Sequence, residues 1–302
     1  MKEYIEIVEV SPRDGLQNEK KILSTVQKLE LINRSIDAGC TRIEVTSFVN
    51  PKRVPQMFDA DEVVKNLPEI RTKNVKFIGL ALNERGYQRA LESNLDIVNY
   101  AIVATDTFSI RNQGATTSDN LKTLGKILAE SGNKIETAVT VAASFGCPFD
   151  GEISVSHLLS IIEKIVAMGL KEICLADTIG VATPKDIKTK LRAIGRAFPQ
   201  LKMKLHLHNT RNTGIANAWA GIEEEVIGLE SAFGGSGGCP FAPKATGNIP
   251  TEDLLYMLDR SGIATGICLE KSIETAHWLE KQLEHPLPGL LKKTEKFPPN
   301  LV

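Results

Sequence analysis

The chain contains 302 residues, of which 42% are hydrophobic and 24% are charged, as is typical of a globular protein with a sizeable core. Its 36 lysines and arginines are nearly balanced by 37 aspartates and glutamates, which gives a formal net charge of −1. This balance excludes a strong overall field that would hold nucleic acid or an anionic membrane surface. Because no apolar run reaches the roughly eighteen residues that a membrane span needs, no membrane partner is expected.

Short runs rich in β-branched residues recur along the chain and predict strands. They lie at residues 4–10, 42–48, 76–82, 97–104, 136–143, 172–177, 204–208 and 226–233. Since the first run begins at Tyr4, we expect no signal or transit peptide. The five cysteines are scattered and odd in number, which does not suggest a disulfide framework, so we expect a reduced protein in the cytoplasm.

Segments with helical periodicity lie between these strands. The best defined covers residues 24–38, where Ser24 is placed to cap the amino end and Gly39 to stop the carboxyl end. Pro184 suits the first turn of another helix, at 184–197. Further helices are predicted at 119–131, 155–168, 251–262 and 268–283.

The strands and helices alternate eight times, which predicts a protein of the α/β class with the (β/α)8 fold of a TIM barrel. A doubly wound sheet is the alternative, but no GxGxxG motif follows the first strand to support it. The last two helices are additional to the repeat. We therefore expect one catalytic domain over residues 1–283, followed by a tail rich in proline and lysine at 284–302. In a barrel, catalytic groups gather in the loops where strands end.

Arg13 and Asp14 directly follow the first predicted strand. An arginine there offers a cation for a developing oxyanion, and an aspartate offers a metal ligand, although a surface ion pair in a turn explains them equally well. Glu44, on the second strand, points away from its apolar neighbours, toward either the barrel interior or the helices. A buried carboxylate at Glu44 would need a partner such as Arg13, whereas an exposed position at the bottom of the barrel would not.

The seventh strand carries His206 and His208. Residues i and i+2 of a strand share a face, so both imidazoles can reach one ion, and we favour this over a pair of core imidazoles that lack partners. With the carboxylate of Asp14 from a nearby strand end, they suit Mg²⁺, Mn²⁺ or Zn²⁺, among which the sequence does not choose. The remaining histidines, at 157, 277 and 285, are expected to be structural or surface residues.

A glycine-rich segment, Gly234–Gly238, follows the eighth strand and leads directly to Cys239. So many glycines predict a movable lid. A cysteine on this lid could act as an acid or base, and the alternative is that Cys239 is a small residue that fills a turn. Asn248, shortly afterwards, offers a further oxygen ligand. Asp177, where the sixth strand ends, is a further candidate, either as an orienting carboxylate of the site or as a helix cap.

Taken together, these motifs closely resemble those of the hydroxymethylglutaryl-CoA lyase family, within the wider group of DRE-type metal-dependent barrel enzymes. The resemblance extends from the first strand to residue 267. The matching segments are Val8–Lys20, Ile43–Gln56, Phe145–Gly151, Ala176–Pro184, Gly237–Asn248 and Thr251–Leu258.

The resemblance implies a role for each candidate residue. The ligands of a catalytic Mg²⁺ or Mn²⁺ would be Asp14, His206, His208 and Asn248. The catalytic residues would be Cys239, Arg13, Glu44, Asp177 and His206. Arg13 would also bind substrate by steadying the enolate oxygen of the thioester, and Lys20 would help to hold the CoA portion. Cys239 would take part in proton transfer.

The implied reaction cleaves 3-hydroxy-3-methylglutaryl-CoA to acetyl-CoA and acetoacetate, in leucine degradation or another thioester route. Barrels of this group often pair, so a homodimer is expected. One departure concerns the run Asn209–Asn212, where the best-known members read Asp-Thr-Tyr-Gly. Asn209 and Arg211 are expected to put an extra cation, and no carboxylate, beside the acid end of the substrate, which leaves the acyl group open.

Three alternatives therefore stay open. The chain would be a lyase for a related tertiary hydroxyacyl-CoA such as citramalyl-CoA, or a Claisen-type condensing synthase of the same barrel group. Such synthases usually carry a long C-terminal extension. The least favoured alternative is a non-catalytic barrel that binds a metal and senses a ligand. Such a barrel would not need Arg13, Asp14, both strand-seven histidines and Cys239 together, and all of them are present.

Overall fold

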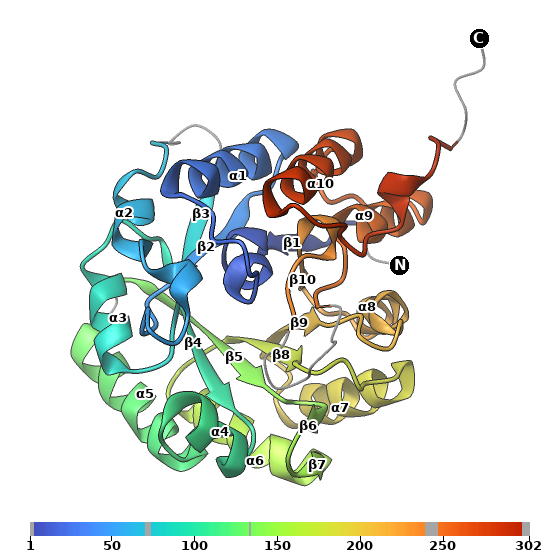
Figure 1. Ribbon diagram of the computed structural model, residues 1–302. Coiled ribbons are helices and arrows are strands. Elements are labelled where there is room, and N and C mark those ends of the chain that lie inside the picture. The colour runs from blue at the N-terminus through green and yellow to red at the C-terminus, as the bar shows by residue number, and fades with distance from the viewer. Residues whose placement is uncertain (1–2, 70–73, 133, 239–246, 298–302) are drawn as a thin grey trace.

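A computed structural model describes residues 3–69, 74–132, 134–238 and 247–297. Parallel strands form a closed barrel in the order β1, β10, β9, β8, β5, β4, β3, β2, and helices surround it (Figure 1). This confirms the predicted TIM barrel. The barrel strands are β1 (Glu6–Glu9), β2 (Arg42–Ser47), β3 (Lys76–Ala81), β4 (Ile97–Val103), β5 (Glu136–Ala142), β8 (Glu172–Asp177), β9 (Lys202–Leu207) and β10 (Gly228–Ser231).

The helices lie outside the barrel, and the predicted ones begin and end close to the expected residues. The α-helices are α1 (Thr25–Ala38), α2 (Ala60–Lys65), α3 (Glu84–Leu91), α4 (Asp106–Gln113), α5 (Thr117–Ser131), α6 (Val155–Ala167), α7 (Pro184–Ala197), α8 (Gly214–Glu223), α9 (Thr251–Arg260) and α10 (Leu269–Leu283). Helices α2, α3 and α4 were not predicted, because they are too short for a helical period to stand out. Helix α8 was also missed, because its residues are mostly small or apolar and show no clear polar face. None of the helices in the described ranges is long and apolar enough to cross a membrane.

Short elements complete the chain. A two-stranded hairpin, β6 (Gly146–Cys147) with β7 (Gly151–Glu152), follows β5. The tighter or wider helical turns are η1 (Ser11–Gly15), η2 (Pro55–Met57), η3 (Phe233–Gly235) and η4 (Leu291–Lys293), of which η1 is a π-helical turn.

Helix α1 shows how local sequence sets the element boundaries. The Ser24 hydroxyl accepts a hydrogen bond from the backbone N–H of Gln27, while the Gln27 side chain accepts one from the Ser24 N–H, so the two form a capping box. Gly39 ends the helix with a φ of 105°, a left-handed conformation that favours glycine. Helix α10 lies beside α1, and the Gln27 amide donates to the Gln282 side chain at 2.7 Å (Figure 1).

The amino-terminal end of the barrel interior is filled by ion pairs. Arg42 contacts Glu6 at 2.9 Å, Glu136 at 2.9 Å and Glu172 at 3.2 Å. Lys204 lies 2.9 Å from Glu6 and 2.6 Å from Glu172. Because buried charges must be paired, this network satisfies the polar groups that close one end, and it leaves the opposite end for a ligand.

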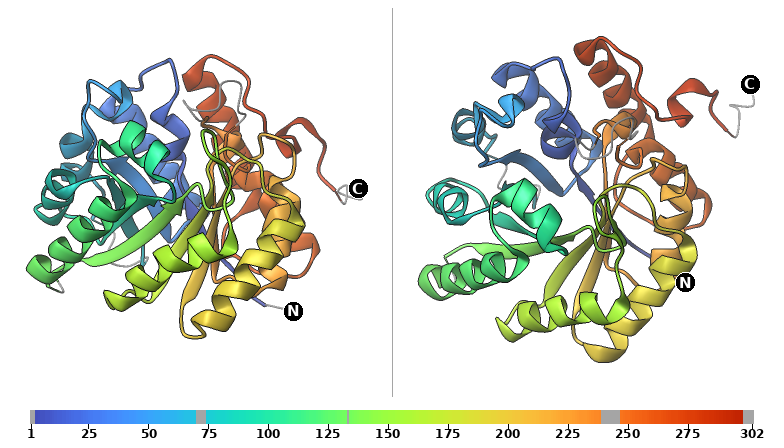
Figure 2. Two further views of the ribbon diagram at one scale, coloured as in Figure 1. Left: turned by 90° about the horizontal axis from the view of Figure 1, so that it is seen from below. Right: turned by 60° about the horizontal axis from the view of Figure 1, so that its bottom comes forward.

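The segment after α10 packs against the barrel. Leu287 is buried and lies against Gly234, and the backbone N–H of Gly289 donates to the Gly234 carbonyl at 2.8 Å. The backbone N–H of Leu291 donates to Asp253, on α9, at 2.7 Å. This segment therefore supports the start of the glycine-rich stretch, and it runs along the outer side of α9 and α10 (Figure 2).

Candidate active site

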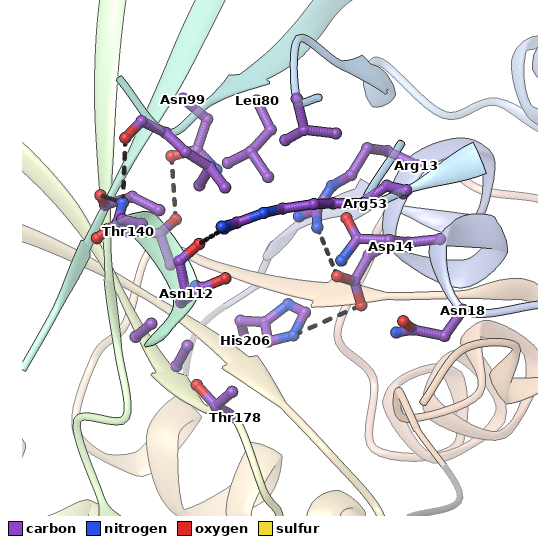
Figure 3. A pocket seen from close by; sticks show the side chains of 18 of the residues that line it. Arg13, Asp14, Asn18, Arg53, Leu80, Asn99, Asn112, Thr140, Thr178 and His206 are labelled. Carbon is purple, nitrogen blue, oxygen red and sulfur yellow. Dashed lines mark hydrogen bonds and ion pairs between the residues drawn. The ribbon is translucent and has the colours of Figure 1, made fainter. Parts of the chain in front are cut away.

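A cavity of about 630 Å³ lies at the carboxyl ends of the barrel strands (Figure 3). Its size suits a small organic ligand, and several polar side chains converge on it. Its lining includes Arg13, Asp14, Arg53, Asn99, His206 and His208. The catalytic end of the barrel thus contains the residues that the strand ends predicted.

Three predicted metal ligands, Asp14, His206 and His208, lie together at one side of the cavity. Their ligand atoms are all within 4.8 Å of one another. The Nε2 atoms of the two imidazoles are 3.1 Å apart, and the Asp14 Oδ2 atom lies 3.9 Å from each of them. Residues from η1 and from the end of β9 therefore surround one point, as the i and i+2 spacing of the histidines predicted.

The surroundings of this cluster fit a divalent cation. Glu230 lies 2.8 Å from His206 Nδ1, which fixes a proton there and leaves the Nε2 lone pair free for a metal. The Asn248 amide nitrogen donates to Asp14 Oδ2 at 2.8 Å, while its buried Oδ1 atom has no hydrogen-bond partner within the described ranges. Two imidazoles, a carboxylate and an amide oxygen form a donor set that suits Mg²⁺ or Mn²⁺.

Arg13 joins this cluster to Glu44. Its guanidinium donates to Asp14 Oδ1 and to Glu44 Oε2, at 2.5 Å in each case, and the residue is only 7% exposed. Burial by itself would raise the pKa of Asp14, but Arg13 and the two imidazoles outweigh it and hold that pKa well below its usual range. Burial, aided by repulsion from Glu230 and Asp14, raises the pKa of Glu44 to about 7 in spite of Arg13.

Glu44 faces the barrel interior, with 1% of its surface exposed, so the alternative of an exposed position is wrong. Its Oε1 atom accepts a hydrogen bond from Asn99 on β4 at 3.2 Å. The Thr140 hydroxyl on β5 in turn donates to Asn99 at 3.0 Å (Figure 3). A polar chain from Arg13 across β2, β4 and β5 thus orients the guanidinium toward the cavity.

Hydrogen bonds through Glu9 and Ser11 connect the turn that carries Arg13 and Asp14 to the residues that follow β10. The Glu9 carboxylate accepts hydrogen bonds from the Ser11 N–H at 2.9 Å and from the Thr251 hydroxyl at 2.7 Å. The Ser11 hydroxyl accepts the Phe233 N–H at 2.6 Å. Burial raises the pKa of Glu9 to about 7. These bonds hold η1 against the start of the glycine-rich stretch.

The glycine-rich stretch approaches the metal ligands closely. Gly237 has a φ of 117°, and a Cβ atom there would lie 2.8 Å from the Asn248 amide nitrogen. Only glycine allows this approach. The Asn18 side chain, which also lines the cavity, donates to the Gly238 carbonyl at 2.7 Å. Cys239, the predicted lid cysteine, lies outside the described residues.

Four predicted site residues within the described ranges are not among those that line the cavity: Glu44, Asn248, Asp177 and Lys20. Glu44 and Asn248 contact residues that do line it. Asp177 is buried and accepts hydrogen bonds from the backbone N–H groups of Val181 at 2.9 Å and Ala182 at 3.0 Å. It therefore orients the loop before α7, while its neighbour Thr178 faces the cavity. Lys20 is exposed beyond the cavity lining, so its expected contact with a CoA portion stays a prediction.

The departure at residues 209–212 does not place a cation in the cavity. The Arg211 guanidinium donates to the carbonyls of Ile179 at 3.0 Å and Gly180 at 2.9 Å. The Asn209 side chain accepts the Gly214 N–H at 3.0 Å, at the start of α8. The expectation that Arg211 and Asn209 lie beside the acid end of a substrate is therefore wrong, because local backbone groups hold both side chains.

Polar cavity residues that the sequence reasoning missed include Glu230, Asn99 and Arg53. Asn99 interrupts a strand that is otherwise apolar, and Glu230 is a charged residue in a strand whose four residues are all buried. A polar group at a buried strand position is a signal that could have singled both out. Arg53 lies in an exposed turn between β2 and α2, where an arginine is common and carries no such signal.

A closed (β/α)8 barrel with this polar cavity at the carboxyl ends of its strands defines a barrel enzyme. The HMGL-like family matches residues 4–279. The chain therefore belongs to the HMGL-like family, which confirms its resemblance to hydroxymethylglutaryl-CoA lyases and makes it a carbon–carbon lyase.

Individual relatives cover nearly the whole chain. It is 41% identical to the (R)-citramalyl-CoA lyase of Chloroflexus aurantiacus over 309 residues, which cover 99% of this chain and 98% of the relative. It is 38% identical to the human mitochondrial hydroxymethylglutaryl-CoA lyase, over 91% of this chain and 84% of the relative. A solved HMG-CoA lyase of Acinetobacter baumannii, in complex with coenzyme A and 3-methylmalate, is 37% identical and superposes with a TM-score of 0.93, over 98% of this chain and 96% of that one.

Proposed function

We propose that this lyase cleaves 3-hydroxy-3-methylglutaryl-CoA to acetyl-CoA and acetoacetate, with Mg²⁺ or Mn²⁺ as its cofactor. The observation that carries the proposal is the guanidinium of Arg13, which lies 2.5 Å from Asp14 of the ligand cluster, inside one cavity. A carbon–carbon lyase of this kind needs a metal for a hydroxyl and a cation for a thioester oxygen at neighbouring positions, and this cavity offers both.

The residues that would hold the cation are Asp14, His206, His208 and Asn248. When bound, the cation supplies Lewis acidity that lowers the pKa of the substrate's tertiary hydroxyl. Glu230 keeps the His206 ring oriented toward that position. Because these groups are buried or nearly so, their electrostatic effect on a ligand is stronger than it would be in water.

Arg13 would act on the leaving fragment. The hydroxyl proton passes to a base, and the oxygen forms a carbonyl with the carbinol carbon. The bond from that carbon to the thioester α-carbon breaks, and its electron pair stays on the thioester fragment as the acetyl-CoA enolate. Arg13, held by Glu44, would donate hydrogen bonds to the enolate oxygen where this charge develops. Protonation of the α-carbon then gives acetyl-CoA, and we propose Cys239 as the residue that takes part in this proton transfer.

Citramalyl-CoA is the second candidate substrate. The 41% identity to a citramalyl-CoA lyase extends over 99% of the chain, which favours this shorter acyl group. Its tertiary hydroxyl and its carboxylate are on the same carbon, so pyruvate rather than acetoacetate would be the second product. The same metal cluster and Arg13 would serve both reactions, because both release the acetyl-CoA enolate.

The test is to incubate the purified protein with Mg²⁺ and each thioester separately and to measure acetyl-CoA release. We expect release from at least one thioester, and its loss after chelation with EDTA and recovery when Mg²⁺ or Mn²⁺ is added back. If neither thioester is cleaved, while acetyl-CoA is condensed with a keto acid, the proposal is wrong and the chain is a condensing synthase.

A further inference from the structure

We infer that Arg53 binds the free carboxylate of the acyl group and so selects acyl-CoA thioesters that end in an acid. This inference rests on the proposed function and adds a residue that determines specificity. Arg53 belongs to the turn after β2, whose backbone is fixed because the N–H groups of Arg53 and Val54 donate to the Asn50 carbonyl at 2.9 and 3.1 Å. Its side chain extends from this turn across the cavity (Figure 3).

The charge of Arg53 is not neutralised by any acidic side chain within the described ranges. Its Nη1 atom donates to the backbone carbonyl of Asn112, on α4, at 3.4 Å, which is long for such a bond. A carboxylate would accept shorter, charge-assisted hydrogen bonds from the same guanidinium, in the paired geometry that arginine favours. The present contact is therefore one that an anionic ligand would readily replace.

The other two arginines of the cavity lining have partners. Arg13 contacts both Asp14 and Glu44 at 2.5 Å. Arg111 lies over the Phe149 ring, with its guanidinium carbon 4.2 Å from the ring centroid, and it lowers the pKa of Asp150, although less than the hydrogen bond from Thr105 does. An acid group that enters the cavity would thus meet at Arg53 a guanidinium that neither an aromatic ring nor an acidic side chain of the described residues occupies.

The position of Arg53 favours the acyl carboxylate over the phosphates of CoA. In the view of Figure 3 its side chain runs from the side of Asp14 toward Asn112, with Asn99 and His206 on either side of it. A cavity of about 630 Å³ takes the acyl group and the inner part of the pantetheine arm, so the nucleotide phosphates would lie outside it. One carboxylate oxygen would face the metal cluster and the other would face Arg53, which would fix the carbinol carbon relative to Arg13.

The test compares three ligands in wild-type protein and in Arg53→Met. The first is whichever of 3-hydroxy-3-methylglutaryl-CoA and citramalyl-CoA the wild type cleaves faster, for which KM and kcat are measured. The second is 3-hydroxy-3-methylbutanoyl-CoA, in which a methyl group replaces the acid arm, and the third is free CoA. Inhibition constants are measured for these two uncleaved ligands. Arg53 is an exposed loop residue, so its replacement should leave the fold intact.

We expect Arg53→Met to raise the KM of the acid substrate about 10- to 100-fold with a smaller change in kcat, as for a lost charged hydrogen bond. The inhibition constants of the two ligands that lack the acyl carboxylate should stay within about twofold. Arg53→Lys should recover part of the loss. Lys52→Met, which removes an exposed charge next in sequence and outside the cavity lining, should change none of the three constants by more than about twofold.

Two results would overturn the inference. If Arg53→Met raises the inhibition constant of free CoA by the same factor as the KM of the acid substrate, Arg53 binds phosphate instead. If the KM of the acid substrate is unchanged, Arg53 binds neither group. Failure of the proposed function looks different, because the wild type itself would then cleave neither thioester.

Discussion

At the scale of single residues, the sequence predicted which candidate metal ligands lie together better than it predicted the residues that hold them. Asp14, His206 and His208 follow from two rules: catalytic groups gather where barrel strands end, and alternate residues of a strand share a face. Glu230 could not be placed beside His206, because that contact depends on the pairing of β10 with β9, in which Glu230 is the register partner of His206. Register between strands is a property of the closed barrel and not of either segment alone.

Replacing Glu230 with glutamine should weaken metal binding about 10- to 100-fold, since the carboxylate that fixes the His206 ring is lost. Titration calorimetry with Mn²⁺ measures this directly. Glu224→Gln, at an exposed ion pair with Arg192 on the outer surface, is the control and should keep the wild-type affinity. Equal affinities in all three proteins would show that Glu230 does not orient a ligand.

At the scale of elements, the strands were predicted almost completely and the helices only in part. Buried parallel strands are continuous apolar runs, as in β4, where all seven residues are buried, so they stand out in the sequence. Helices α2 and α3, of six and eight residues, are held in place by the barrel and span too few turns for a helical period to be recognised in the sequence. The extra helices α9 and α10 were predicted, but their packing with the segment around Leu287 was not.

The contact between α9 and η3 predicts a pH effect on stability. Glu252 is fully buried and accepts the Gly234 N–H at 2.9 Å, and burial raises its pKa to about 8. Because the folded state holds this proton more tightly than the unfolded state, its contribution to the free energy of unfolding is full below the unfolded pKa and is lost as pH rises through about 8. Stability should therefore fall as the solution becomes more alkaline.

In Glu252→Gln the amide oxygen can still accept the Gly234 N–H, and the titration is removed. We expect its thermal midpoint to fall less steeply than that of the wild type between about pH 5 and about pH 9. Burial also raises the pKa of Glu9 to about 7, so some pH dependence should remain in the variant. Parallel curves for the two proteins would mean that Glu252 does not titrate in this range.

At the scale of the whole molecule, the two ends of the barrel have separate tasks. The carboxyl ends of the strands surround the cavity, while the amino ends are closed by the ion pairs of Arg42 and Lys204. The fold class was predictable because eight alternations fit few other architectures. The polar interior of the barrel could not be predicted. In the sequence, Arg42, Glu172 and Lys204 cannot be distinguished from charged residues on the surface.

Replacing Arg42 with methionine should therefore lower stability without changing catalysis. It leaves three carboxylates short of a partner, and because these are partly exposed, we expect a loss of about 1–3 kcal/mol in the free energy of unfolding. Urea denaturation measures the loss, and kcat should stay close to the wild-type value. Lys76→Met, which removes a half-exposed pair with Glu136, should cost less. A fall in kcat at unchanged stability would contradict this division of tasks.

The Asn248 amide donates to the Asp14 carboxylate from 234 residues further along the chain, and His206 and His208 come from the end of β9. During translation, a nascent chain that has completed only its first strands possesses one carboxylate and no centre able to trap an ion. Metal binding can stabilise only the closed barrel, in which β1 pairs with β10. Its free energy therefore favours the final step of folding, when the last strands dock. A chain released before that step gains nothing from the ion, whatever the supply of metal in its surroundings.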